Sequence, residues 1–227
     1  MSATLQHAAH LLPRPPVLVL ASASPRRREL LWQLGVAHRV AVADLHEHRF
    51  EREPAAACVQ RLALAKAMKI WQAAPAPDAS TARAAPVLPV LGADTAVVID
   101  GEMLGKPSDR DVAMRMLARL SGRTHLVLTA VALIGPRGSA QRLSQSEVSL
   151  RVLAEAEIAA YWDSGEPRDK AGGYAIQGLG AAFVSELRGS YSGVMGLPLF
   201  ETAALLDAAG VPRGQLQRPA REWPADA

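Results

Sequence analysis

The sequence predicts an α/β fold, in which helices pack in layers on a sheet. Strand-like and helix-like hydrophobic patterns alternate along the chain, which favours this class over a helical bundle or a β-sandwich. Apolar residues make up 49% of the 227 residues, enough for a sizeable core, and aromatic residues only 4%, so aliphatic side chains must fill it. We expect a folded domain at 17–210, between a flexible extension at 1–16 and a tail at 211–227.

The first unit of the chain reads as a strand, a tight turn and a helix. Residues 17–21 are apolar without interruption, as in a buried strand. Ser22 or Ser24 can cap the helix that follows, and Pro25 suits its first position. Gly35 marks the end of that helix, because glycine readily adopts the backbone conformation that terminates helices.

The middle of the chain contains the strongest turn signal. A helix is predicted at about 54–71, and the Pro/Ala-rich segment at 73–86 lacks periodicity and reads as a surface loop. A long strand is predicted at 87–99. Asp100 and Gly101 then form a typical hairpin turn, from which the chain returns through 102–106.

The last third of the folded domain is unusual in its glycine content. A capping-box-like sequence from Ser108 to Asp111 opens a helix that reaches Leu120. The glycine-rich segment at 165–196 is expected to turn or to bind a ligand, and SYSG at 190–193 reads as another turn. Strands are expected at 124–134 and 143–153, and helices at 154–163 and 198–209.

Composition excludes several classes of protein. The formal charge of +3 is a small excess that suits a small polyanion as well as a nucleic acid. Cys58 is the one cysteine, so neither a disulfide framework nor a cysteine-based zinc site can form within the chain. No apolar run approaches the roughly 18 residues of a membrane span. We therefore expect a soluble, cytoplasmic protein without a membrane partner.

Three consecutive arginines, Arg26 to Arg28, occupy the first turn of the first predicted helix. The helix dipole disfavours cations there by roughly 0.3 to 1 kcal/mol each. The free amides of that turn, with Ser22 and Ser24, form a ready anion site, so a polyphosphate would suit the place. The alternative is an Arg-rich helix start that is simply solvated.

Two charged side chains lie within apolar patterns. Lys66 shares a helical stripe with apolar residues, and it either extends its ammonium to the surface or directs it into a cleft. Asp94 interrupts an apolar strand, where a carboxylate needs a partner, a hydrogen bond or a metal. A structural role at a bulge is the alternative for Asp94. Gly92 suggests that a ligand approaches this strand closely.

The loops contribute further candidates. Asp169, Lys170 and Gln177 lie among flexible glycines, and the two donors and one acceptor of a glutamine amide suit the edge of a nucleobase. Glu47 is a second acid of interest beside Asp94. The histidines at 38, 46 and 48 are not spaced as a metal site.

Taken together, these motifs resemble the Maf family. They occur in order along the chain, from about residue 17 to 208. They are LASASPRR at 20–27, LGADT at 91–95, GKP at 105–107, LSGRTH at 120–125, GEPRDKAG at 165–172, IQG at 176–178 and GLP at 196–198. The resemblance implies an elongated, twisted mixed sheet flanked by helices, related to inosine triphosphate pyrophosphatases, with two lobes, a central cleft and commonly a homodimer.

The resemblance also assigns roles. It makes Asp94 the proton acceptor, and it implies a divalent cation, Mg²⁺ or Mn²⁺, near Glu47, Asp94 and Asp169. The residues after Ser-Pro, after the catalytic Asp and before the late Gly-x-Gly differ between subgroups of the family. In this sequence those three specificity positions are Arg26, Thr95 and Gln177. The resemblance further implies that the substrate is bound by Ser22, Arg27, Lys66, Lys106 and Lys170.

This subgroup pattern is similar to that of enzymes acting on dTTP and UTP. The expected reaction is hydrolysis of the nucleoside triphosphate to the monophosphate and pyrophosphate, with modified pyrimidine nucleotides as further candidate substrates. The segment at 73–86 reads as an insertion, and Gly173 and Ala175 depart from the family pattern. The alternative is a non-catalytic regulator of septum formation that binds nucleotides or nucleic acid. The chain lacks the interleaved aromatics of a single-strand platform, so we expect no specific nucleic-acid partner.

Overall fold

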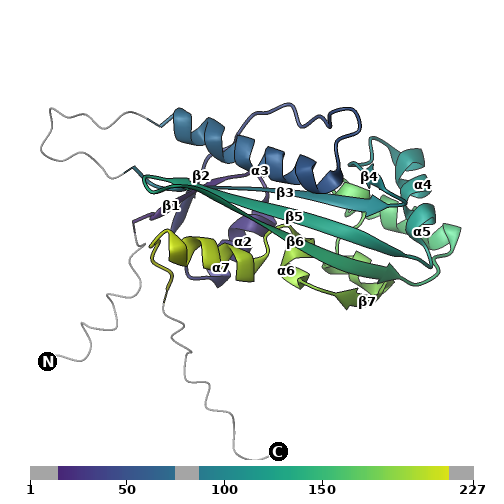
Figure 1. Ribbon diagram of the computed structural model, residues 1–227. Coiled ribbons are helices and arrows are strands. Elements are labelled where there is room, and N and C mark those ends of the chain that lie inside the picture. The colour runs from purple at the N-terminus through teal and green to yellow at the C-terminus, as the bar shows by residue number, and fades with distance from the viewer. Residues whose placement is uncertain (1–14, 75–86, 215–227) are drawn as a thin grey trace, which may run out of the picture.

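A mixed β-sheet with helices on both faces forms the frame of the molecule (Figure 1). The computed structural model describes residues 15–74 and 87–214. Within them, seven strands form one sheet in the order β2-β1-β3-β5-β6-β7, with β4 paired to β3. This confirms the α/β class. The strands are β1 (Leu18–Ala21), β2 (His38–Val40), β3 (Val90–Ile99), β4 (Glu102–Leu104), β5 (Thr124–Gly135), β6 (Gly138–Leu150) and β7 (Val184–Arg188).

The helices gather in three places around this sheet. In Figure 1, α3 lies along one face, α2 and α7 cover the other face near β1, and α4 and α5 lie at the far end. None of the helices in the described ranges is long and apolar enough to cross a membrane. They are α2 (Pro25–Gln33), α3 (Ala55–Gln72), α4 (Arg110–Leu120), α5 (Glu155–Asp163), α6 (Tyr191–Met195) and α7 (Leu199–Ala208), with short 3₁₀ turns at Ala171–Gly173 and Gly178–Phe183.

Strand β3 carries both faces of the core because its side chains alternate. Leu91 and Ala93 pack with buried leucines of α2 and α7, and further along Val97 and Ile99 pack with α4 and α5. On the opposite face, Ala96 and neighbouring residues pack against α3. Two separate apolar clusters therefore occupy the two ends of the same sheet face.

The sheet has a gap in the middle of β3. Strand β1 runs parallel to β3 and pairs with it only from Val90 to Gly92, whereas β4 pairs with it from Val97 to Ile99. Residues 93–96 of β3 therefore have no neighbouring strand on that edge, although β5 pairs with them on the other side. We call this edge, residues 93–96, the notch. Side chains on both faces of β3 can approach it.

Gly92 has a packing role that differs from the one expected. A Cβ at this position would collide with the carbonyl oxygen of Ala63 and crowd the backbone nitrogen of Ala67, both in α3. The glycine therefore lets α3 pack directly on β3, which is the reason for a small residue here, rather than the approach of a ligand.

Several elements differ from the prediction in their bounds. The short edge strands β2 and β7 carry no strong hydrophobic pattern and were not predicted. Strand β6 starts at Gly138 rather than 143, because its polar first residues pair with the end of β5. Helix α4 is capped by Asp109, whose carboxylate accepts from the amide of Val112. The expected turn at 190–193 is the start of α6, with Ser190 as its cap.

The ends of the chain are only partly described. The extension predicted at 1–16 and the loop predicted at 73–86 lie largely outside the described residues, as does most of the tail predicted at 211–227. The described part of that tail packs on the domain. Val211 is buried in the cluster formed with α2 and α7, and the amide of Gly214 donates to the carbonyl of Gly35 at 3.0 Å.

Candidate active site

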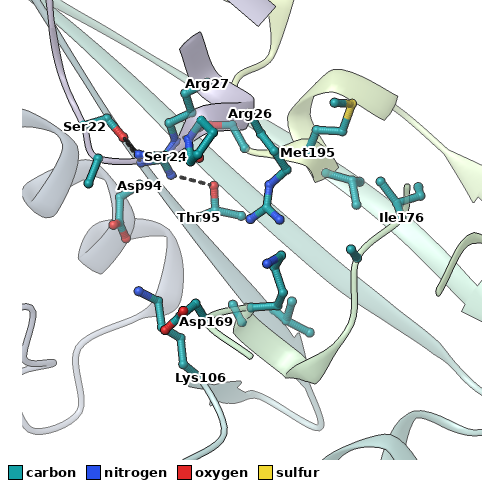
Figure 2. Close-up of a pocket in the computed structure, with 18 of the residues that line it drawn as sticks. Ser22, Ser24, Arg26, Arg27, Asp94, Thr95, Lys106, Asp169, Ile176 and Met195 are labelled. Atoms are coloured by element: carbon teal, nitrogen blue, oxygen red, sulfur yellow. Dashed lines mark hydrogen bonds between the residues drawn. The ribbon is translucent and has the colours of Figure 1, made fainter. Parts of the chain in front are cut away.

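A cavity of about 880 Å³ opens at the notch, and it gathers every predicted site residue (Figure 2). The turn after β1, helix α3, strand β3 and the glycine-rich loops all contribute to its walls. Ser22 and Gln177, which are 155 positions apart in the chain, both contribute to this lining, an arrangement that only the fold produces. The predicted residues in its lining are Ser22, Arg26, Arg27, Glu47, Lys66, Asp94, Thr95, Lys106, Asp169, Lys170 and Gln177.

The turn after β1 presents its backbone to the cavity. Ser22 is buried, and its Oγ accepts a hydrogen bond from the amide of Ser24 at 3.1 Å. Ser24 holds the N-cap position of α2 without a side-chain cap, and Pro25 is the first helical residue. The amides of the first turn of α2 are therefore not satisfied by a capping side chain, and they remain available to an anion.

Arg27 holds the backbone of the notch in place through hydrogen bonds. Its Nη1 donates to the carbonyl of Ala93 at 2.9 Å, which replaces the missing neighbouring strand. Its Nε donates to the carbonyl of Gly196 at 2.7 Å, and its Nη2 donates to Oγ1 of Thr95 at 3.2 Å. A longer contact of 3.4 Å joins Nη1 to Oγ of Ser22. Most of the guanidinium donors are thus used within the protein, and the phosphate contact expected from the sequence stays a prediction.

A buried lysine joins two carboxylates on the other side of β3. Nζ of Lys66 lies 2.6 Å from Oδ1 of Asp94 and 2.7 Å from Oε1 of Glu47. The side chains of Lys66 and Asp94 are 8% and 10% exposed, so neither charge is well solvated, while that of Glu47 is 45% exposed. The apolar stripe of α3 therefore directs Lys66 into the cavity rather than out to solvent.

The two carboxylates differ in acidity because they differ in burial. Burial raises the pKa of Asp94 above its ordinary value, and the charge and hydrogen bond of Lys66 offset this only in part. Burial also works against the ionisation of Glu47, but the hydrogen bond and charge of Lys66, aided by Lys106, hold the pKa of Glu47 below its ordinary value. Asp94 is therefore the more basic carboxylate of the pair.

Cations without a carboxylate partner line the rest of the cavity. Within the described residues, Arg26, Lys106 and Lys170 take part in no salt bridge. Figure 2 shows Arg26 projecting into the cavity, with Lys106 and Asp169 across it from Ser22 and Asp94. Burial and the charge of Arg26 lower the pKa of Lys170. An anion bound between these cations would relieve their repulsion.

The predicted metal ligands do not by themselves form a metal site. Within residues 15–74 and 87–214, no three His, Cys, Asp or Glu side chains lie close enough together to hold a metal ion. Between Glu47 and Asp94 lies the ammonium of Lys66. Asp169 is exposed on a loop, in a left-handed conformation with φ 61°. Any divalent cation would therefore need ligands from a second molecule, such as phosphate oxygens.

The far end of the cavity combines apolar walls with one polar group. Tyr174, Ile176, Val194 and Met195 contribute to its lining. Oε1 of Gln177 is buried and has no hydrogen-bond partner within the described structure. The sequence did not predict these four residues as site residues, because apolar side chains in a glycine-rich segment are indistinguishable in sequence from residues that pack into the core.

The fold and the site define a class. This is an α/β protein in which a buried carboxylate and several cations, without a salt bridge among the described residues, line a nucleotide-sized cavity beside the carboxyl end of β1. Such a site is expected of a protein that binds and cleaves phosphate compounds. The sequence profile described as Maf-like protein matches residues 17–209. The chain therefore belongs to the Maf family.

Several similar proteins share one name. A dTTP/UTP pyrophosphatase of Saccharophagus degradans is 52% identical over 202 residues, which cover 89% of this chain and 93% of the relative. A dTTP/UTP pyrophosphatase of Bordetella parapertussis is 51% identical over 209 residues, covering 89% and 97%. A third, from Alkalilimnicola ehrlichii, is 52% identical over 192 residues, covering 85% and 92%.

Proposed function

We propose that this chain is a nucleoside triphosphate pyrophosphatase that hydrolyses dTTP and UTP to the monophosphate and pyrophosphate. The observation that carries the proposal is the pairing of buried Asp94 with Lys66 beside a cavity whose lining includes cations that form no salt bridge within residues 15–74 and 87–214. The names of the relatives at about half identity support the choice of substrates.

Binding of the triphosphate follows from the charges around the cavity. Lys106, Lys170 and Arg26 offer positive charge, and the amides at the start of α2 offer hydrogen-bond donors. Arg27 contributes mainly by holding the carbonyls of Ala93 and Gly196, so that the notch keeps its shape. The binding energy is therefore concentrated on the phosphates, where charge changes during the reaction.

Asp94 is the proton acceptor in this proposal. A water oxygen bonds to the α-phosphorus, and a proton of that water passes to the carboxylate of Asp94. The bond between the α-phosphorus and the bridging oxygen breaks, and its electron pair leaves with pyrophosphate. A raised pKa suits a general base, because proton transfer is most efficient when the pKa of the base approaches the working pH.

A divalent cation, Mg²⁺ or Mn²⁺, is part of the proposal. Glu47 and Asp169 are accessible carboxylates in the cavity lining, and Mg²⁺ commonly binds one or two carboxylates together with substrate phosphates. When bound, the cation would neutralise developing charge on the phosphates. Lys66 lies against both Glu47 and Asp94, but Asp94, which the sequence also suggested as a ligand, is 10% exposed whereas Glu47 is 45% exposed. Asp94 is therefore better suited to accepting the proton than to holding a hydrated cation.

Selection of the base is assigned to Arg26, Thr95 and Gln177. Uracil and thymine present a ring N–H between two carbonyl oxygens, and a glutamine amide offers a matching acceptor and donor. Gln177 meets this need because Oε1 is buried without a partner. Thr95 acts through Arg27, because its Oγ1 accepts a hydrogen bond from Nη2 of Arg27. Modified pyrimidine nucleotides with the same ring edge are candidate substrates as well.

The remaining parts of the proposal concern the cellular location and the oligomeric state of the protein. We propose a cytoplasmic enzyme that works as a homodimer. Gel filtration with light scattering tests the dimer, and a mass equal to one chain of 24.1 kDa would contradict it.

The activity is tested with a panel of nucleotides. Purified protein is incubated with dTTP, UTP, CTP and GTP in the presence of Mg²⁺, and monophosphate and pyrophosphate are quantified. We expect both products, in equal amounts, from dTTP and UTP in preference to CTP and GTP. Release of orthophosphate instead of pyrophosphate would contradict the cleavage site. Tight binding without turnover would favour the non-catalytic regulator.

A further inference from the structure

Two segments at the far end of the cavity are tied together by a tyrosine and a glutamate. Tyr161 lies on α5, and Glu166 lies in the loop that follows it. Glu166 contributes to the lining of the cavity, and the hydroxyl of Tyr161 donates to its Oε1 at 2.9 Å. Neither residue has a part in the proposed chemistry.

This pair holds both ends of the segment that carries Gln177. The amide of Ala175 donates to the hydroxyl of Tyr161 at 3.1 Å. The amides of Leu179 and Gly180 donate to the carboxylate of Glu166 at 2.8 and 2.9 Å. Gln177 lies between these anchor points. Its own Oε1 makes no hydrogen bond in the described structure, so the position of its side chain depends on the backbone around it.

Two glycines in the turn at Ala175–Gly180 leave room for the carboxylate of Glu166 and the hydroxyl of Tyr161. Gly178 has φ 81°, and a Cβ there would collide with the carboxylate oxygens of Glu166. A Cβ at Gly180 would collide with the carbonyl of Ala175 and the hydroxyl of Tyr161. Gly178 is therefore required by the carboxylate of Glu166, and Gly180 by the hydroxyl of Tyr161 and the carbonyl of Ala175. The close fit means that the turn takes one conformation around Glu166.

The donors around Glu166 require an ionised acceptor. All of its described partners donate, since the hydroxyl of Tyr161 uses its acceptor position for Ala175 and its proton for Glu166. Burial works against ionisation, but the bonds from Gly180, Leu179 and Tyr161, followed by the charge of Lys170, keep the pKa of Glu166 below its ordinary value. An amide in its place would turn a donor toward at least one of these donors.

We propose that Glu166, supported by Tyr161, is the positioning residue for nucleobase recognition: it holds the turn at Ala175–Gly180 so that Gln177 faces the base. The proposal rests on the proposed function. Glu166 touches neither the phosphates nor the reacting water in this scheme. Its loss therefore weakens recognition of the base and leaves recognition of the phosphates in place.

The test compares a probe that has a base with one that lacks it. For Glu166→Gln, we expect KM for UTP to rise roughly 10- to 100-fold with a smaller change in kcat, because loss of one buried hydrogen bond to the base weakens binding by a factor of about this size. The preference for UTP over GTP falls in parallel. The inhibition constant of inorganic triphosphate, which fills only the phosphate site, does not rise. Tyr161→Phe is expected to change KM in the same direction.

Glu157→Gln is the matched control. Glu157 is also a carboxylate that accepts from a backbone amide, that of Ala154 at 3.0 Å, and it pairs with Arg151 at the start of α5, away from the cavity. Its loss is expected to lower the thermal midpoint of unfolding without changing the preference for UTP. The comparison separates a positioning effect from a general loss of stability.

Two outcomes would overturn the proposal. The first is an unchanged KM for UTP in Glu166→Gln, and the second is an inhibition constant for inorganic triphosphate that rises as much as KM. Calorimetric binding of uridine monophosphate to the same variants gives a measurement that is independent of turnover. Absence of UTP hydrolysis in the unmodified protein would contradict the proposed function alone, and weaker binding of uridine monophosphate to Glu166→Gln would still support the positioning role.

Discussion

Replacing Lys66 with methionine tests the electrostatics of the site directly. Methionine keeps an unbranched apolar side chain along α3 and removes the ammonium that lies 2.6 Å from Asp94 and 2.7 Å from Glu47. The carboxylate of Glu47 is 45% exposed and can turn toward water. That of Asp94 is 10% exposed and cannot, so it is left buried without its counter-ion.

The size of the effect is limited by protonation of Asp94. A carboxyl group with an ordinary pKa of about 3.9 takes up a proton at a cost of about 4.2 kcal/mol at pH 7 and about 1.5 kcal/mol at pH 5. From this source the variant can lose up to about 4 kcal/mol of unfolding free energy at pH 7, and correspondingly less at pH 5. In the folded variant Asp94 holds a proton that it lacks in the unfolded chain. The unfolding free energy of the variant therefore falls, relative to that of the unmodified protein, as pH rises.

Urea unfolding at pH 5 and pH 7 measures this difference. Lys69→Met is the control, because Lys69 lies on the same helix but is exposed, and its change in stability should not depend on pH. Activity should fall at pH 7, since a protonated Asp94 cannot accept a proton, and it should recover in part at higher pH. A loss of stability in Lys66→Met that is as large at pH 5 as at pH 7 would refute the reasoning.

Three further predictions concern other residues. Asp94→Asn removes the base at nearly constant volume and should lower kcat about 10²- to 10⁴-fold, or by about 2.7 to 5.4 kcal/mol in activation free energy, with cooperative unfolding retained; near-normal hydrolysis would rule out the base. Gln177→Glu should lower the ratio of UTP to GTP turnover, by about 5- to 150-fold if one buried contact of 1 to 3 kcal/mol is lost, and an unchanged ratio would leave no role for this amide. Burial lowers the pKa of His125 to about 4 from 6.5, so its contribution to stability is present above pH 6.5 and is lost as pH falls toward 4. Between pH 6.5 and 4, the unfolding free energy of His125→Gln should therefore fall less than that of the unmodified protein, by up to about 3 kcal/mol. Parallel profiles of unfolding free energy against pH for the two proteins would contradict this.

The sequence was sufficient wherever a local pattern carried the information. The strand β1, the helix α3 and the hairpin turn at Asp100 follow from periodicity and turn chemistry, and the structure has them near their expected bounds. Charged residues in apolar patterns identified Lys66 and Asp94, because burial of an unpaired charge is too costly to occur without a partner. The alternation of elements was enough for the α/β class.

Other elements and contacts depended on distant parts of the chain. The edge strand β2 has only one row of partners and a weak pattern, and the start of β6 is polar because it is exposed and held by pairing to β5. The sequence could not show that Gly92 serves helix packing, since the colliding atoms belong to α3. Nor could it show that Arg27 is bonded mainly to the protein itself.

By itself, the sequence determined which residues are chemically out of place and which elements carry them. Only the tertiary structure decided how they meet. The site exists because β1 and β4 pair with different parts of β3 and leave 93–96 without a neighbour, so that Asp94 and Thr95, whose side chains alternate across the strand, both reach one cavity. Such a gap is a property of strand register between segments far apart in the chain, and local sequence patterns carry no information about it.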